Sequence, residues 1–244
     1  IAVRLQSALE DGNLTPQNFT VSRLSNLMKT TVQAMDQVYS DIFGLLGTHM
    51  DSLADHEASY QYNALNRIIP DVATNRHPLS KIAPAQIVAA AKAKPMQGVL
   101  LKDWAQKASR DTVRKVQNAA QTGFLLGESY TDIIKRVQGT KAANYKDGAL
   151  GSAGNDLTAV VKSTVSHYAA SARELTGQAN ADLIKAREWL STLDSHTSPM
   201  CIIRDKKQYT MDTAPKPIGH KIPYGAGPGK LHYGCRSTET WVTK

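Results

Sequence analysis

The sequence predicts a mainly α-helical protein with long N-terminal helices, a helical domain after them, and a small loop-rich α+β unit at the C-terminal end. Apolar residues recur at intervals of three and four through most of the first 190 positions, which is the helical period. The 244 residues are 41% apolar but only 6% aromatic, so the core must be largely aliphatic. Residues 213–229 hold four prolines and four glycines, which disfavour regular structure. We therefore expect a helical arm over 1–80 and a domain over 81–244, whose terminal unit spans 186–244.

The first predicted helix carries a long apolar stripe. Thr15 and Pro16 form a suitable start, because threonine caps helices and proline fits the first helical position. The stripe then spans more than thirty residues, or roughly 45 Å at 1.5 Å per residue, with Gly44 and Gly47 as points where the helix can bend. Such a stripe needs a partner surface on this chain or on another. Its members are Leu24, Leu27, Met28, Val32, Met35, Val38, Ile42, Leu46, Met50 and Leu53.

Further elements are predicted from the periodicity of the apolar residues and from the positions of proline and glycine, which end helices and strands. We expect a connector over 70–85, helices over 85–93, 99–121, 130–138 and 155–181, and a flexible glycine-rich loop over 139–155. Ser129 and Asn155 are the predicted N-caps of the last two helices, and Gly139 ends the first of these.

The terminal unit is predicted to contain strands. Trp189, Leu190 and Leu193 lie in a short segment with strand character. The pairs at 202–203 and 208–209 flank a charged turn and indicate a hairpin. The segment 225–230 is rich in glycine and ends in lysine, but no strand leads into it and no helix clearly follows. We therefore interpret 225–230 as a flexible loop rather than a phosphate-binding loop.

The composition argues against a disulfide-rich scaffold and against a membrane-spanning protein. Two cysteines do not make a disulfide scaffold, so the chain can fold in a reducing cytoplasm. No stretch approaches the ~20 apolar residues of a membrane-spanning helix, and no signal peptide is evident. We expect a soluble protein.

The net charge of +8 is unevenly distributed. Residues 81–146 alone carry +8, from 12 basic and 4 acidic side chains. Such a stretch attracts polyanions, above all DNA or RNA. A solvated basic face without a partner is the alternative, because no aromatic interleaving or nucleic-acid motif accompanies the charge. The candidate nucleic-acid contacts are Lys102, Lys107, Arg110, Arg114, Lys115, Lys135 and Arg136.

The two cysteines and a nearby histidine form a candidate metal site. Cys201, His232 and Cys235 supply thiolate and imidazole, the ligands that zinc prefers, and a His-x-x-Cys pair is a chelating spacing. His220 or Asp194 could supply a fourth ligand. A structural zinc site, a disulfide and free thiols all remain open.

A catalytic thiol with His232 as its base is disfavoured. His232 and Cys235 lie in one short turn, and nothing in the sequence marks an oxyanion hole. Asp194 and Thr197 are instead predicted to stabilise the preceding turn, with Arg236 as an ionic partner of Asp194.

The terminal motifs resemble those of a known family. EWLSTLDSHTSPMCIIRDKKQY, followed by a Pro/Gly loop and LHYGCRS, is similar to the phage Mu F-like head-morphogenesis proteins, also called minor head proteins. The likeness covers roughly residues 85–244, and its terminal motif is fairly specific as an ordered set. The positions that carry it are Trp189, Asp194, Thr197, Cys201, Tyr209, His232, Cys235 and Arg236.

The resemblance implies a structural role in a tailed bacteriophage. A protein of this family is made in the host cytoplasm and is present in few copies inside the capsid, near the portal vertex of the virion. Its expected partners are the portal protein, other capsid or scaffold proteins and packaged phage DNA, bound without sequence preference. It assists head assembly and the packaging or ejection of DNA, and it is not an enzyme. The alternative is a metal-dependent nuclease or toxin-like effector built on the same domain, although paired carboxylate motifs for such chemistry are missing from the terminal unit.

Overall fold

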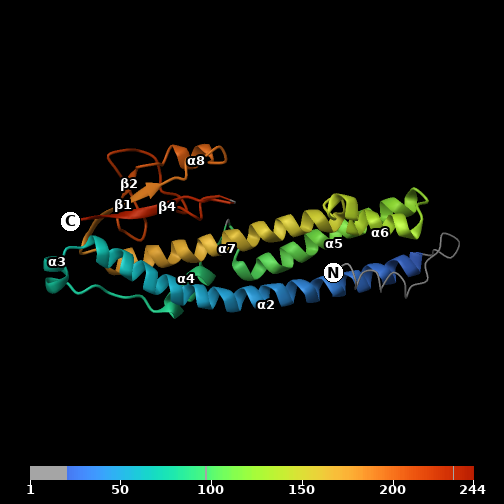
Figure 1. Ribbon diagram of the computed structural model, residues 1–244, viewed down its shortest axis with the longest axis horizontal. Coiled ribbons are helices and arrows are strands. Elements are labelled where there is room, and N and C mark those ends of the chain that lie inside the picture. The colour runs from blue at the N-terminus through green and yellow to red at the C-terminus, as the bar shows by residue number, and fades with distance from the viewer. Residues whose placement is uncertain (1–20, 97, 233) are drawn as a thin grey trace. The chain divides into compact units, whose positions relative to one another are not determined.

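The chain is mainly helical, as predicted, and a small antiparallel sheet lies near its C-terminus (Figure 1). The computed structural model describes residues 21–96, 98–232 and 234–244. The helices are α2 (Val21–Ile68), α3 (Asp71–Arg76), α4 (Pro84–Ala93), α5 (Leu101–Leu125), α6 (Tyr130–Gln138), the 3-10 helix η1 (Lys141–Ala143), α7 (Ala149–Ala179) and α8 (Pro199–Ile202). The strands are β1 (Ile184–Leu190), β2 (Gln208–Tyr209), β3 (Pro217–Ile218) and β4 (Thr238–Thr243). None of the helices within the described ranges combines the length and the apolar character needed to cross a bilayer.

The chain divides into two compact units, and neither is a continuous stretch of sequence. The first unit comprises residues 1–46 and 102–160, and the second comprises 47–101 and 161–244. The expected boundary between residues 80 and 81 falls inside the second of these units. The physical reason is that α2 and α7 are long, unbroken helices, each of which contributes one end to each unit.

The first unit is built on the predicted apolar stripe of α2. Met35 is fully buried and packs with Val113 and Val116 of α5 and with Val137 of α6. The helix extends to Ile68, so its 48 residues measure about 72 Å rather than the expected 45 Å. The predicted start at residues 15–16 lies outside the described part of the chain.

The cap of α6 is confirmed. The Ser129 hydroxyl accepts a hydrogen bond from the backbone N–H of Asp132, and the helix ends at Gly139, which has a φ of 90°. The prediction worked because both signals are local and lie at the two ends of a short amphipathic segment.

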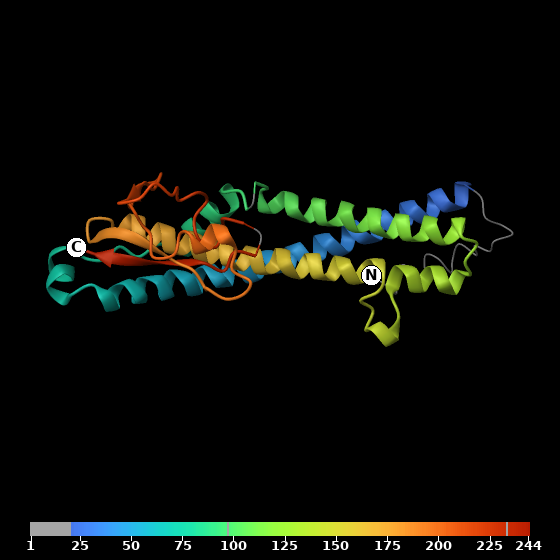
Figure 2. The same cartoon turned by 90° about the horizontal axis from the view of Figure 1, so that it is seen from above.

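The start of α7 differs from the prediction. The helix begins at Ala149, six residues before the expected cap at Asn155, and η1 lies in the loop that leads to it (Figure 2). The glycines there permit close packing. A Cβ on Gly148 would lie 2.1 Å from the backbone nitrogen of Gly139, and one on Gly151 would lie 2.4 Å from the carbonyl oxygen of Tyr145. The glycine-rich segment is therefore a tight turn rather than a flexible loop.

The second unit combines α3, α4 and the ends of α2 and α7 with a sheet of order β3-β2-β1-β4. All neighbouring strands are antiparallel. Apolar side chains of α2 and of the sheet share one core, made of Leu65, Ile69, Leu183, Ile184 and Trp241.

The second unit differs from the prediction in three places. The expected hairpin does not form, because Pro199–Ile202 is the short helix α8 and β2 pairs instead with β1 and β3. The expected connector over 70–85 contains α3, and β4 was not predicted at all. Strand β4 pairs with β1 along most of its length.

The loop at 225–230 is anchored by its lysine. Lys230 is 8% exposed, and its Nζ lies 2.7 Å from Oε2 of Glu174 on α7. Lys94 contacts the other carboxylate oxygen at 2.9 Å. The lysine is thus engaged in an internal ion pair, in agreement with the interpretation that this segment is not a phosphate-binding loop.

Candidate metal centre

Three ligand-type side chains converge in the terminal unit, as predicted. The Cys201 and Cys235 sulfurs lie 3.7 Å apart, and the Cys201 sulfur lies 3.1 Å from Nε2 of His232. All three ligand atoms lie within 4.8 Å of one another. Both cysteines are buried, at 2% and 3% exposure.

Local structure positions Cys201. Ser198 is the N-cap of α8 and Pro199 occupies its first turn, so the chain turns abruptly into the helix. The backbone N–H of Cys201 donates to the Ser198 hydroxyl, and its carbonyl accepts from Ser191 at 2.8 Å. These contacts fix the direction in which the thiol projects.

A second tight turn positions the other two ligands. The backbone N–H of Cys235 donates to the His232 carbonyl at 3.1 Å, and Gly234 between them has a φ of 67°. Residues at this spacing on one turn present their side chains to a common point. Around both cysteines pack the aromatic residues Trp189, Tyr209 and Tyr224.

The distances fit a shared metal better than a covalent bond between the thiols. Two thiolates on one tetrahedral zinc, with bonds of about 2.3 Å, lie about 3.8 Å apart, close to the observed 3.7 Å. A disulfide requires about 2.05 Å, and both cysteines are free. A donor set of two thiolates and one imidazole selects zinc over magnesium or calcium, which prefer oxygen ligands.

Neither of the expected fourth ligands joins the group. His220 uses Nε2 to contact the carbonyl of Gln208 at 2.9 Å, while its Nδ1 accepts from the backbone N–H of Ile222. Its ring packs edge-on against Tyr209, and both of its nitrogens are occupied. Asp194 is bound instead by Arg236. Both assignments are therefore corrected.

The predicted ionic support of the turn is confirmed. Arg236 donates two hydrogen bonds of 2.5 Å to the Asp194 carboxylate, in a bidentate arrangement. Thr197 donates to the same carboxylate and accepts from the Asp194 backbone N–H. The Arg236 guanidinium lowers the pKa of Asp194, and the N–H of His196 adds to this effect. Asp194 therefore ties the turn that precedes Cys201 to the residue that follows Cys235.

Ser198 is the member of the site that the sequence interpretation missed. Its hydroxyl lies 2.8 Å from Nε2 of His232, besides capping α8. The Ser-Pro pair at 198–199 is a helix-start signal and could have revealed the cap. Its approach to His232 could not be foreseen, because that contact spans 34 positions of sequence.

The surface above the cluster offers little room. The accessible space there is about 10 Å³, bordered by Thr197, Ser198, His232 and Arg236. This is the volume that one water molecule needs. The arrangement suits a cross-link that closes the unit, because the adjacent space holds about one water molecule.

The predicted nucleic-acid contacts fall into two groups. Five of the seven cations are engaged by neighbours: Lys115 with Asp156, Lys135 with Asp132, Arg136 with Glu128, Arg114 with Asp111, and Lys107 over the Trp104 ring. Lys102 and Arg110 have no carboxylate partner within the described residues, and both are exposed. The structure does not bring all seven to one surface feature.

The chain was also compared with family models, with curated proteins and with solved structures, and none of them matches it.

Proposed function

We propose that this chain is a structural minor head protein of a tailed bacteriophage, whose terminal unit is closed by a zinc ion. The observation that carries the proposal is the convergence of Cys201, His232 and Cys235 beneath a surface with room for only about one water. The ordered motif that holds these residues is the one that resembles the Mu F-like head-morphogenesis proteins.

In this proposal the protein docks near the portal inside the capsid, contacts packaged DNA, and assists head assembly and DNA packaging or ejection. The long α2 helix and the basic stretch 81–146 suit such contacts with protein and DNA.

The metal of the terminal unit has a structural role in this proposal. When bound, zinc would join the turn at 198–201 to the turn at 232–235.

The chain's own residues prepare that cross-link. The Asp194–Arg236 pair holds the two turns together at the surface, and the aromatic side chains around the cysteines shield the thiols from water. Pro and Gly residues separate the turns, so helical packing cannot fix their distance. A metal can contribute this stability, because it binds only the folded arrangement.

The zinc is tested by elemental analysis of protein purified without a histidine tag. We expect one zinc per chain, and loss of the metal in Cys201→Ser and in His232→Ala. His220→Gln is the matched control, because His220 lies in the same unit but outside the group, and it should retain the metal. Wild-type protein without bound metal, or loss in the His220 variant alone, would contradict the assignment.

The role in the virion is tested on purified particles of the phage that encodes the chain. We expect mass spectrometry to find the protein in far fewer copies than the major capsid protein. It should resist external protease in intact heads and become sensitive once the heads are opened. Absence from particles would overturn the proposal. Cleavage of plasmid DNA by the purified protein with Zn²⁺ or Mg²⁺ would instead favour the nuclease alternative.

A further inference from the structure

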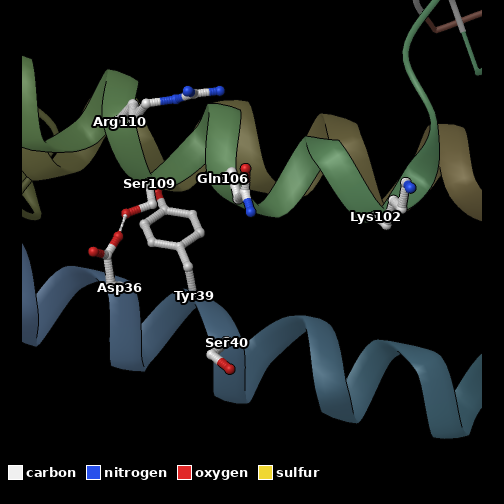
Figure 3. A pocket seen from close by; sticks show the side chains of 7 residues that line it. All are labelled: Asp36, Tyr39, Ser40, Lys102, Gln106, Ser109 and Arg110. Atoms are coloured by element: carbon white, nitrogen blue, oxygen red, sulfur yellow. Dashed lines mark hydrogen bonds between the residues drawn. The ribbon is translucent and has the colours of Figure 1, made fainter.

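The first unit contains a polar groove that the metal centre does not involve. It lies between α2 and α5, has a volume of about 530 Å³, and is open to solvent (Figure 3). The α2 wall contributes Asp36, Tyr39 and Ser40. The α5 wall contributes Lys102, Gln106, Ser109 and Arg110. A groove of this size can hold a ligand of several hundred cubic ångströms.

The floor of the groove is held in place by two hydrogen bonds between the helices. The Tyr39 hydroxyl lies 2.6 Å from the Thr112 hydroxyl, and the Ser109 hydroxyl donates to the Asp36 carboxylate at 2.5 Å. Tyr39 is only 3% exposed, so its ring forms the base and is not a stacking surface. The two walls are therefore fixed before any ligand arrives.

Neither cation of the groove has a carboxylate partner within the described residues. Lys102 and Arg110 are exposed and lie on the same face of α5, with Gln106 midway between them. Eight residues of helix separate their Cα atoms by about 12 Å. A nucleic-acid strand presents about one phosphate per 3.4 Å of helix axis, so this span faces three or four phosphates.

We propose that this groove receives the phosphodiester backbone of a nucleic-acid strand. Lys102 and Arg110 provide the charge, while the Gln106 amide and the Ser40 hydroxyl can donate hydrogen bonds to phosphate oxygens between them. The Asp36 carboxylate repels the strand from the α2 wall and directs it towards α5. This inference rests on the proposed contact with DNA and assigns it to a particular surface.

The first test is salt-dependent binding of a fluorescein-labelled 20-base-pair DNA of mixed sequence. The double substitution Lys102→Gln/Arg110→Gln should weaken binding on the order of 50-fold at 0.1 M salt, because each lost phosphate contact removes a factor of about 8 there. The slope of log K against log [salt] should fall by about 1.8. Circular dichroism should be unchanged, since both side chains are exposed.

The matched control removes the same charge from elsewhere in the unit. Lys115→Gln/Lys135→Gln deletes two lysines that Asp156 and Asp132 already neutralise, so its effect should be at most a few-fold. Equal weakening by both double variants would show that net charge alone matters and would overturn the groove. Wild-type binding with an unaffected groove variant would overturn the groove but leave the proposed function. No binding by the wild type in 50 mM salt would refute the groove and the proposed DNA contact together.

A second test uses the carboxylate of the groove. Asp36→Asn removes the only negative charge among the lining residues, so binding should tighten by about three- to tenfold. Asp41→Asn is the control, because Asp41 is an exposed carboxylate on the same helix that does not line the groove. Weaker binding in the Asp36 variant would contradict the proposal. So would full displacement of DNA by 10 mM inorganic phosphate at constant ionic strength, which would indicate a site for a single anion.

Discussion

At the scale of single residues, the buried ion pair between Glu174 and Lys230 links the glycine-rich loop to α7. Burial alone would raise the pKa of the Glu174 carboxyl, but Lys230 and Lys94 outweigh it and lower the pKa to about 2. The folded-state value therefore lies below the ordinary value of 4.5. The stabilisation is fully present above about pH 4.5 and is lost as the pH falls towards 2.

We expect Glu174→Gln to lower the free energy of unfolding by about 3 kcal/mol at pH 7, because it leaves Lys230 buried without its counter-charge. Urea denaturation at several pH values measures this. The difference from wild type should shrink between pH 4.5 and 2. Lys94→Met is the control and should cost about 1 kcal/mol or less, because the Lys94 side chain is 43% exposed. A difference that persists unchanged at pH 2 would contradict this account.

The three residues of the metal site could be predicted from one local pattern and from residue type. His232 and Cys235 form a chelating pair within a few positions, and Cys201 is the other cysteine of the chain, a residue type that zinc prefers. The sequence could not show that His220 stays outside the metal site. Its nitrogens are taken by Gln208 and Ile222 through contacts that depend on how the Pro/Gly loop closes.

At the scale of elements, the glycines of α7 have opposite roles within one turn. Gly151 faces the backbone of the preceding loop, where an added Cβ would lie 2.4 Å from the Tyr145 carbonyl oxygen. Gly154 has nothing within 4 Å of that position. Backbone cannot rotate away as a side chain can, so the start of the helix must shift if Gly151 is enlarged.

This contrast predicts opposite effects of the same substitution. Gly151→Ala should destabilise the protein by about 1–3 kcal/mol through overpacking. Gly154→Ala should stabilise it by about 0.5–1 kcal/mol, because alanine restricts the unfolded chain and favours helix. Thermal unfolding of the two variants measures both shifts. Stabilisation by both would mean that the helix starts later, near the predicted cap at Asn155.

The helices were largely predictable, and the small sheet was not. Periodicity marks a helix with many repeated positions, as in the stripe that contains Met35 and Leu46. By contrast, β2 and β3 have two residues each, and they depend on neighbouring strands: β2 pairs with β1, and β3 pairs with β2. The glycines before α7 resemble loop residues in sequence, because the close approach that requires them involves residues several positions away.

At the scale of the whole molecule, the path of the chain makes each unit depend on distant segments. A cut between residues 80 and 81 would remove Met35 from the core of the first unit and Leu65 from that of the second. We expect the isolated fragment 81–244 to lose cooperative thermal unfolding, and an equimolar mixture with fragment 1–80 to regain it. Wild-type unfolding by 81–244 alone would contradict the division into two interleaved units.

Because the core of the second unit combines distant segments of the sequence, its residues leave the ribosome at different times. The ribosome releases Leu65 and the apolar face around it early, yet Trp241, which packs in the same core, follows about 180 residues later. At 5–20 residues per second, that interval lasts about 9–36 s. For most of that interval, Leu65 lacks its core partners Leu183, Ile184 and Trp241, because all three come late in the chain. We therefore expect the yield of this protein to respond to the supply of chaperones that bind exposed apolar helices.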